Sequence, residues 1–286
     1  MAASDAVTTW GDVRRAVERE LGSADDARRI VEEACGADWA TRLAEPVSER
    51  AAGYVQRMVE RRRNGEPLQY AVGRWGFRHL DLFVDSRVLI PRPETEVVAG
   101  VALEQLITLG RDPTVVDLGT GSGAIALSIA HEVPDAHVWA TDVSGDALAV
   151  ARANLVGLGG RAAPRVRLVE GSWFDALPSE LRGRVQLIVS NPPYVAEHEV
   201  ADLPPEVARW EPMSALVAGP TGLEDVEHLV AEAPAWLARP GALVVEIAPH
   251  QSDAAAALAR DAGFTEVSVR PDLAGRARAL VGRMKG

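Results

Sequence analysis

The sequence predicts an α/β protein with a largely parallel sheet, preceded by a small helical region. Three observations support this prediction. Apolar segments of strand length alternate with helical segments from residue 88 onward. A glycine-rich loop joins one of these strands to the helix that follows it. Residues 1 to about 70 have helical patterns that begin at capping residues.

The helical region is predicted to contain three helices with Ser or Thr caps. Thr9 caps a helix that runs to Leu21, and Ser23 caps a second helix that closes near Gly36. Ser48 opens the third helix. The alternating pattern that follows predicts a β-hairpin. We therefore expect a helical domain at 1–72, a hairpin linker at 73–87 and an α/β domain at 88–286.

Several predicted strands of the α/β domain end at residues suited to bind a ligand. Because the carboxyl ends of parallel strands form one edge of a sheet, residues that follow them should lie close together. We expect strands at 114–118, 136–141, 166–170 and 185–190, with late strands at 241–247 and 267–269. The residues at the first three strand ends are Gly119, Thr120, Gly121, Ser122, Gly123, Asp142, Ser172 and Trp173.

The glycine loop predicts a nucleotide-containing cofactor. Glycines let the backbone turn tightly and approach a ligand where a Cβ atom would intrude. Asp142 has the spacing of an acid that accepts hydrogen bonds from ribose hydroxyls, and Trp173 is a candidate neighbour for an adenine ring. Gly119, Gly121 and Ala124 also satisfy a dinucleotide fingerprint, so the loop alone leaves an NAD-dependent oxidoreductase open.

Asn191, Pro192, Pro193 and Tyr194 follow the apolar strand at 185–190. Proline pushes the preceding residue into an extended conformation, so Asn191 should project from the strand end. Its side-chain oxygen and a backbone carbonyl can each accept one hydrogen of a substrate NH2 group, and Tyr194 offers a flat face. With the glycine loop, this tetrapeptide predicts methyl transfer from S-adenosylmethionine. An adenine-N6 or cytosine-N4 nucleic-acid methyltransferase would use the same chemistry.

Charge and composition narrow the classes of function. The 13 acidic and 11 basic residues up to Gly73 leave 28 acidic and 19 basic residues, a net charge of −9, in the remainder. This acidity disfavours a surface that binds nucleic-acid phosphates. The single cysteine, Cys35, fits a reducing cytosol, and we expect no membrane segment and no metal site. These features predict a cytoplasmic protein.

The chain resembles the bacterial PrmC (HemK) family, the glutamine methyltransferases of peptide chain release factors. The resemblance extends over nearly the whole sequence. Its motifs are Gly65 to Tyr70, Leu89 to Glu96, Asp117 to Gly123, Gly171 to Phe174, Asn191 to Tyr194, and Glu211-Pro212 with Ala215-Leu216. Near the C-terminus, Gly275 to Arg278 depart from the acidic, Asn-containing loop that is more usual in the family.

The resemblance implies a class I S-adenosylmethionine-dependent methyltransferase domain, Rossmann-like with a mostly parallel seven-stranded sheet, after a helical substrate-recognition domain. It implies N5 methylation of the glutamine in the Gly-Gly-Gln motif of class I release factors. Gly119 to Gly123 would face the methionine part of the cofactor, Asp142 its ribose and Trp173 its adenine. Asn191 to Tyr194 would hold the glutamine, and Asn191 with Ser172 would also belong to the cofactor-binding set.

We expect Asn191, Pro192 and Tyr194 to form the catalytic set, without a strong base. The Asn191 side chain and the Pro192 carbonyl would accept the two N–H bonds of the substrate glutamine. These acceptors would stabilise positive charge as it develops on the glutamine nitrogen. The segment Glu94 to Glu96 is expected to begin a helix, where Pro93 and acidic first-turn residues are ordinary. These residues are left out of the catalytic set.

Overall fold

The computed structural model describes residues 8–160 and 162–286. It divides into two compact units, the first ending at Arg74 and the second beginning at Trp75. Residues 1–7 of the predicted helical domain lie outside the described residues. None of the helices in these described parts is long and apolar enough to cross a membrane.

The first unit is a small helical bundle, and its three predicted caps are confirmed. Its helices are α1 (Trp10–Leu21), α2 (Ala24–Cys35), α3 (Glu49–Arg63) and α4 (Leu68–Val72). The side chains of Thr9, Ser23 and Ser48 each accept a hydrogen bond from a backbone N–H in the first turn of the helix that follows. Ile30 and Met58 are among the side chains buried at its centre.

The second unit contains the predicted seven-stranded sheet, with strand order β10-β11-β9-β6-β3-β4-β5. Its strands are β3 (Thr114–Leu118), β4 (His137–Asp142), β5 (Val166–Glu170), β6 (Val185–Ser190), β9 (Leu237–Glu246), β10 (Glu266–Pro271) and β11 (Ala277–Met284). The strands from β5 to β9 pair in parallel, and β11 is antiparallel to both β9 and β10. The prediction of a mostly parallel sheet is confirmed.

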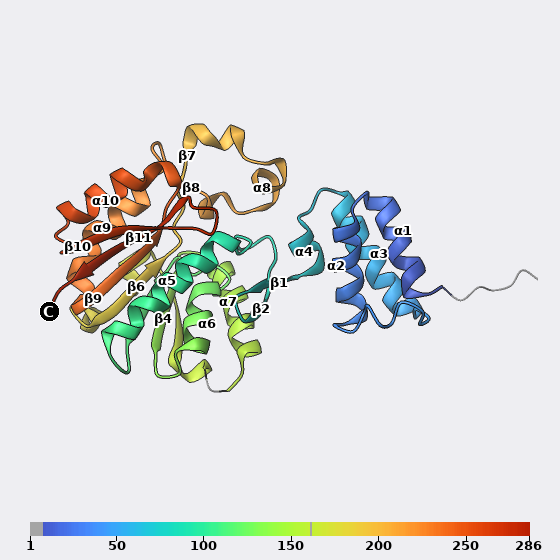
Figure 1. Ribbon diagram of the computed structural model, residues 1–286, viewed down its shortest axis with the longest axis horizontal. Helices are drawn as coiled ribbons and strands as arrows, with labels where there is room; N and C mark the ends of the chain where they lie inside the picture. The colour runs from blue at the N-terminus through green and yellow to red at the C-terminus, as the bar shows by residue number, and fades with distance from the viewer. Residues whose placement is uncertain (1–7, 161) are drawn as a thin grey trace, which may run out of the picture. The chain divides into compact units, whose positions relative to one another are not determined.

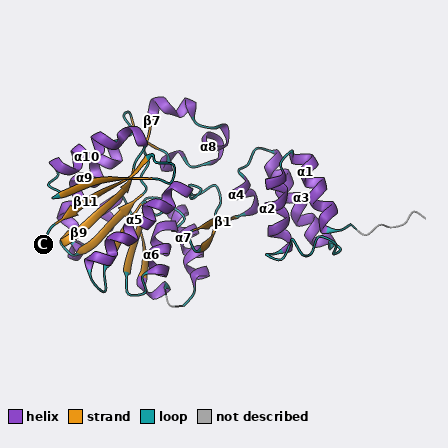
Figure 2. Cartoon of the chain, in the orientation of Figure 1, coloured by secondary structure: helices purple, strands orange, loops and turns teal. Residues whose placement is uncertain are grey.

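Helices cover both faces of this sheet (Figures 1 and 2). One group consists of α5 (Pro93–Leu109), α6 (Ala124–Glu132) and α7 (Gly145–Leu158), and the other of α9 (Glu224–Trp236) and α10 (Ser252–Asp261). Alternate residues of the central strands face the second group, where Leu118, Ile188 and Leu243 belong to one buried apolar cluster. Parallel strands buried on both faces read as continuous apolar runs, which is the pattern of β3 and β6.

A β-hairpin, β1 (Arg74–Phe77) with β2 (Leu80–Phe83), begins the second unit. Arg78 lies in its turn with a positive φ of 52°, and its guanidinium pairs with Glu132 at 2.6 Å. The Asn154 side chain bonds both the N–H and the carbonyl of Phe83, and it also donates to the Ser122 carbonyl at 2.9 Å. Asn154 therefore joins the end of the hairpin to the glycine loop.

The last strand differs from the sequence prediction. We expected two late strands, whereas the structure has β9, β10 and also β11, which lies between them in the sheet. The Arg276 and Arg278 side chains obscured this strand in the sequence. Arg276 pairs with Asp272 and Glu94 before the strand turns inward, and Arg278 is buried on it.

A smaller layer follows β6. β7 (Val195–Ala196) and β8 (Val217–Gly219) form a two-stranded parallel sheet, and α8 (Pro205–Trp210) lies in the segment between them (Figure 1). The N–H of Tyr194 donates to the Leu216 carbonyl at 3.2 Å. This pairing fixes the path of the chain directly after the Asn191 tetrapeptide.

Candidate active site

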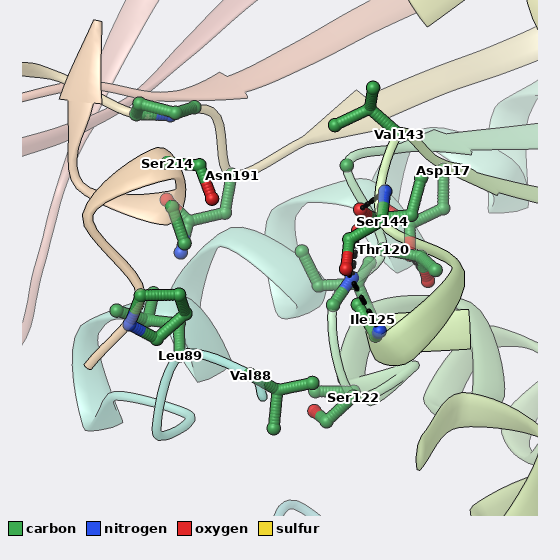
Figure 3. Close-up of a pocket in the computed structure, with 18 of the residues that line it drawn as sticks. Val88, Leu89, Asp117, Thr120, Ser122, Ile125, Val143, Ser144, Asn191 and Ser214 are labelled. Atoms are coloured by element: carbon green, nitrogen blue, oxygen red, sulfur yellow. Dashed lines mark hydrogen bonds between the residues drawn. The ribbon is translucent and has the colours of Figure 1, made fainter. Parts of the chain in front are cut away.

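A cavity of about 300 Å³ opens at the carboxyl ends of the parallel strands. Two neighbouring strands, β3 and β6, contribute its opposite sides, because the strand order reverses between them. Figure 3 shows Asn191 and Ser214 on one side, and Thr120 and Ser144 on the other. Most of the predicted site residues line this cavity: Gly119, Thr120, Gly121, Ser122, Asp142, Ser172, Trp173, Asn191 and Pro193.

The glycine loop adopts conformations that favour glycine. Gly119, Gly121 and Gly123 have φ values of 72°, 55° and 85°. A Cβ atom on Gly119 would approach the Trp173 ring to 3.3 Å, whereas one on Gly123 would approach Leu127 to 3.0 Å. Gly119 therefore keeps the cavity open beside the indole, and Gly123 serves the close packing of α6.

Two carboxylates, those of Asp117 and Asp142, accept hydrogen bonds from this loop. Asp117 is fully buried on β3, and its Oδ2 accepts hydrogen bonds from the Thr120 hydroxyl at 2.7 Å and the Ala126 N–H at 3.1 Å. Its Oδ1 has no partner among the described residues, and burial raises the pKa of this carboxyl to about 7. Asp117 thus lines the cavity and also carries a buried oxygen without a partner among the described residues.

Asp142 lies at the end of β4, as the ribose-binding prediction requires. Its Oδ2 accepts from the Gly121 N–H at 2.8 Å and its Oδ1 from the Ser144 N–H at 2.9 Å. Burial raises its pKa, while these backbone hydrogen bonds oppose the shift. Each carboxylate oxygen has a second lone-pair site, so Asp142 keeps acceptor capacity for two hydroxyl groups.

Trp173 lies against the glycine loop with an unusual backbone. Its φ is 43°, a left-handed conformation that is uncommon for a residue with a large side chain. Burial raises the pKa of the Asp225 carboxyl to about 6, and His228 and the Trp173 side chain oppose that shift. Asp225 lines the same cavity, and no motif in the sequence identifies it as a site residue.

The Asn191 side is built from segments far apart in the sequence. Asn191 follows β6, and the preceding Ser190 donates its hydroxyl to the Leu118 carbonyl at 2.7 Å, which ties the ends of β6 and β3 together. The Asn191 Nδ2 donates to the Thr95 hydroxyl at 3.2 Å. Thr95 lies in the first turn of α5, so the predicted helix start at Pro93 is confirmed.

Pro192 and Tyr194 line a second, adjoining cavity with apolar walls. The two cavities share Leu89, Asn191 and Ala215, so Asn191 lies at their junction. Burial raises the pKa of the Tyr194 phenol to about 12, which keeps its hydroxyl protonated. The tetrapeptide is therefore divided between the two cavities. Asn191 and Pro193 line the main cavity, whereas Pro192 and Tyr194 line only the second one.

A buried ion pair holds the loop before α5 against the loop after α8. The Glu211 carboxylate pairs with Arg92 and accepts the Ile90 N–H at 3.3 Å. Burial raises the pKa of Glu211, and the adjacent Arg92 opposes that shift. The sequence showed both residues only as parts of separate motifs and gave no sign of their contact. Leu89, next to Ile90, and Ser214, three positions after Glu211, both line the main cavity.

No group of three or more potential His, Cys, Asp or Glu ligands for a metal ion occurs within residues 8–160 and 162–286.

Comparison with known proteins agrees with the architecture and with the motifs. The Methyltransferase small domain family model matches residues 98–204, and the PrmC N-terminal domain model matches residues 14–73. A release factor glutamine methyltransferase of Xylella fastidiosa is 44% identical over 84% of this chain and 85% of its own. One of Cereibacter sphaeroides is 41% identical over 92% and 91%, respectively. The chain belongs to the release factor glutamine methyltransferase family.

Solved structures of more distant proteins show the same fold. A methyltransferase from Pyrococcus furiosus is 18% identical with a TM-score of 0.53, covering 84% of this chain and all of the other. The hMettl16 catalytic domain, solved with an RNA hairpin, is 16% identical with a TM-score of 0.55, covering 83% of this chain and 81% of its own. The predicted class I methyltransferase fold is confirmed, and family membership supports the release-factor prediction over the oxidoreductase and nucleic-acid alternatives.

Proposed function

We propose that this protein methylates the side-chain amide nitrogen of the glutamine in the Gly-Gly-Gln motif of class I release factors, with S-adenosylmethionine as donor. One observation carries the proposal. Asn191 and the glycine loop line a single cavity from neighbouring parallel strands, so an amide acceptor and a cofactor loop converge there. Relatives that cover most of the chain are named for this activity.

The cofactor side of the cavity fits S-adenosylmethionine in its donor and acceptor groups. That cofactor supplies a methyl group carried on a sulfonium. Gly119 to Ser122 leave room for a ligand at the loop, and Asp142 has acceptor capacity for ribose hydroxyls. Trp173 and Asp225 offer an aromatic face and an acceptor for an adenine ring.

The glutamine side fits a neutral amide. A carboxamide nitrogen is a poor nucleophile because its lone pair is delocalised. The Asn191 Oδ1 and the Pro192 carbonyl would accept its two N–H bonds and stabilise positive charge developing on the nitrogen. Tyr194 would close the pocket behind the amide plane as a neutral side chain. Holding the nitrogen in line with the methyl group then provides much of the acceleration, and the proton leaves to water.

The proposed setting is the cytoplasm, where release factors act and where one free cysteine, Cys35, stays reduced. The net charge of −11 makes direct binding to nucleic-acid phosphates unfavourable. The partner is therefore the release factor itself.

The test is incubation with methyl-labelled S-adenosylmethionine and an unmethylated release factor, followed by peptide mass mapping. We expect one methyl group on the glutamine of Gly-Gly-Gln, and no detectable methylation with Asn191→Ala within the time that wild type needs to complete the reaction. Label entering adenine or cytosine of added DNA or RNA, with none in the release factor, would overturn the proposal.

A further inference from the structure

A chain of three buried or half-buried polar side chains runs inward from the cavity. The Asn191 Nδ2 donates to the Thr95 Oγ1 at 3.2 Å, and the Thr95 hydroxyl donates to the Glu246 Oε2 at 2.7 Å. Thr95 is 3% exposed and Glu246 is 1% exposed. The three residues come from the loop after β6, from α5 and from the end of β9. Their contact is a property of the tertiary structure alone.

The direction of these hydrogen bonds follows from the number of protons available. A threonine hydroxyl has one proton and can also accept. An ionised Glu246 only accepts, so the Thr95 proton points to Glu246 and the Thr95 oxygen must accept from Asn191. Of the two ends of the Asn191 amide, only the NH2 end donates. While Glu246 is ionised, the Asn191 Oδ1 is therefore the end of the amide that this chain of hydrogen bonds leaves available to a substrate.

A buried cation lies close to Glu246 and favours the ionised form of its carboxyl. Arg278 on β11 is 7% exposed, and it donates to the Ile247 carbonyl at 3.3 Å, one residue beyond Glu246. Burial raises the pKa of Glu246 to about 7, whereas the Thr95 hydrogen bond and the Arg278 charge oppose that shift and favour the carboxylate. The C-terminal segment that departs from the family pattern thus contributes a charge next to this chain of hydrogen bonds.

We propose that Thr95 and Glu246 are positioning residues, which orient the Asn191 amide so that its oxygen, and not its nitrogen, meets the substrate NH2 group. The catalytic consequence rests on the proposed function, but the orientation itself does not. A reversed Asn191 amide would place its own N–H donors against the substrate's N–H donors, and the acceptor needed for charge development would be lost.

The experiment compares Thr95→Val, Thr95→Ser and Glu246→Gln with wild type. Thr108→Val is the matched control, because the Thr108 hydroxyl lies on the same helix and donates only to the Gln105 carbonyl. We expect Thr95→Val to lower kcat roughly 10- to 100-fold, the size of a misplaced reacting group, with KM for the release factor within about twofold. Thr95→Ser should restore kcat to within about threefold of wild type, and Thr108→Val should leave it unchanged.

A second measurement observes the Asn191 side-chain amide directly and does not depend on enzyme activity. In ¹H–¹⁵N spectra, the Asn191 side-chain signals are identified by their loss in Asn191→Ala. We expect Thr95→Val and Glu246→Gln to shift them and speed their exchange with water, and Thr95→Ser to retain them. Unchanged signals in Thr95→Val would overturn the positioning role.

The two measurements separate this inference from the proposed function. A wild type that methylates the release factor, with unaltered kcat and Asn191 signals in Thr95→Val, disproves positioning and leaves the function standing. A wild type that does not label the release factor disproves the function, while the amide signals still decide the orientation. Thr95→Val could instead lower kcat, raise KM and lower the melting temperature together, without rescue in Thr95→Ser. That result would indicate a structural role for Thr95 and would also overturn the positioning role.

Discussion

The two sides of the active-site cavity are built by different means. On the glycine-loop side, the supporting hydrogen bonds span short separations in sequence, 3 positions for Asp117 with Thr120 and 21 for Asp142 with Gly121. On the Asn191 side, Asn191 is 96 positions from Thr95, and Thr95 is 151 positions from Glu246. The first side is therefore largely a local property of its motif. The second exists only once the sheet, α5 and β9 have assembled.

This difference should separate cofactor binding from methyl transfer. Changes in the glycine loop should act mainly on cofactor affinity, because the backbone itself forms that surface. Changes on the Asn191 side should act on turnover or on overall stability, because side chains from several segments converge there. Four substitutions, from the largest expected effect to the smallest, test whether the two sides are independent.

Asn191→Ala should lower kcat about 10²- to 10³-fold, the usual loss when one preorganised charge-stabilising partner is removed. The affinity for S-adenosylmethionine, measured by calorimetry, should stay within about threefold, because the glycine loop and Asp142 are untouched. A comparable loss of cofactor affinity would show that the two sides are a single unit.

Arg92→Ala should lower the free energy of unfolding by roughly 2–3 kcal/mol, because it leaves the Glu211 carboxylate buried without its cation. This is less than for a fully buried pair, since the Arg92 side chain is 29% exposed. Urea denaturation measures the change. Adding Glu211→Gln to Arg92→Ala should recover part of the loss.

The control for this prediction is Arg270→Ala. Arg270 pairs with Glu104 at 3.3 Å, and both side chains are about half exposed. We expect a change of about 0.5 kcal/mol or less. Equal effects of the two arginine substitutions would argue that the Arg92 pair does not hold the loops together.

Glu246→Gln should change how stability depends on pH. Burial raises the pKa of Glu246 from 4.5 to about 7, against opposing effects of Thr95 and Arg278. The folded protein therefore binds this proton more tightly than the unfolded chain, so the associated stability is present below pH 4.5 and is lost as pH rises through about 7.

Between pH 5 and pH 8, wild type should consequently lose on the order of 1–3 kcal/mol more stability than Glu246→Gln. Denaturant titrations across this range measure the difference in slope. The buried Asp117, whose pKa is also raised to about 7, titrates in both proteins and cancels in the comparison. Parallel pH curves would mean that Glu246 does not change its protonation in this range.

Gly119→Ala should have the smallest effect, a loss of about 1–2 kcal/mol in cofactor binding from the left-handed backbone conformation that alanine disfavours. This corresponds to roughly a 5- to 30-fold weaker affinity for S-adenosylmethionine, with kcat at saturation little changed. Gly157→Ala is the control, since a Cβ atom there meets nothing within 4 Å. A loss of kcat without a loss of affinity would contradict the assignment of Gly119 to the cofactor side.

The sequence predicted those parts of the site that its local pattern determines. The glycine loop follows a buried strand, and Asp142 ends the next one, so parallel pairing alone brings them to one edge. Asn191 was likewise found because Pro192 terminates an apolar run. The capped helices of the first unit were recognised for the same reason, since a cap and its helix are neighbours in the chain.

The parts that were missed depend on tertiary contact. Arg92 and Glu211 are separated by 119 positions, and nothing in either motif identifies the other as its partner. The division of the Asn191 tetrapeptide between two cavities depends on the β7–β8 pairing, which is too short to leave a sequence pattern. β11 was missed because Arg276 directly precedes it and Arg278 and Arg283 interrupt its apolar residues, and the partners of these arginines lie on other segments.

The Asn154 side chain joins the hairpin to the glycine loop, so that local unfolding of one should disrupt the other. It bonds the N–H and the carbonyl of Phe83 and, at 2.9 Å, the Ser122 carbonyl. The Phe83 amide proton can exchange with solvent only when this junction opens. A ligand that stabilises the glycine loop must oppose that opening. Hydrogen exchange of the Phe83 amide should therefore slow when the cofactor is bound, although Phe83 does not line the cavity.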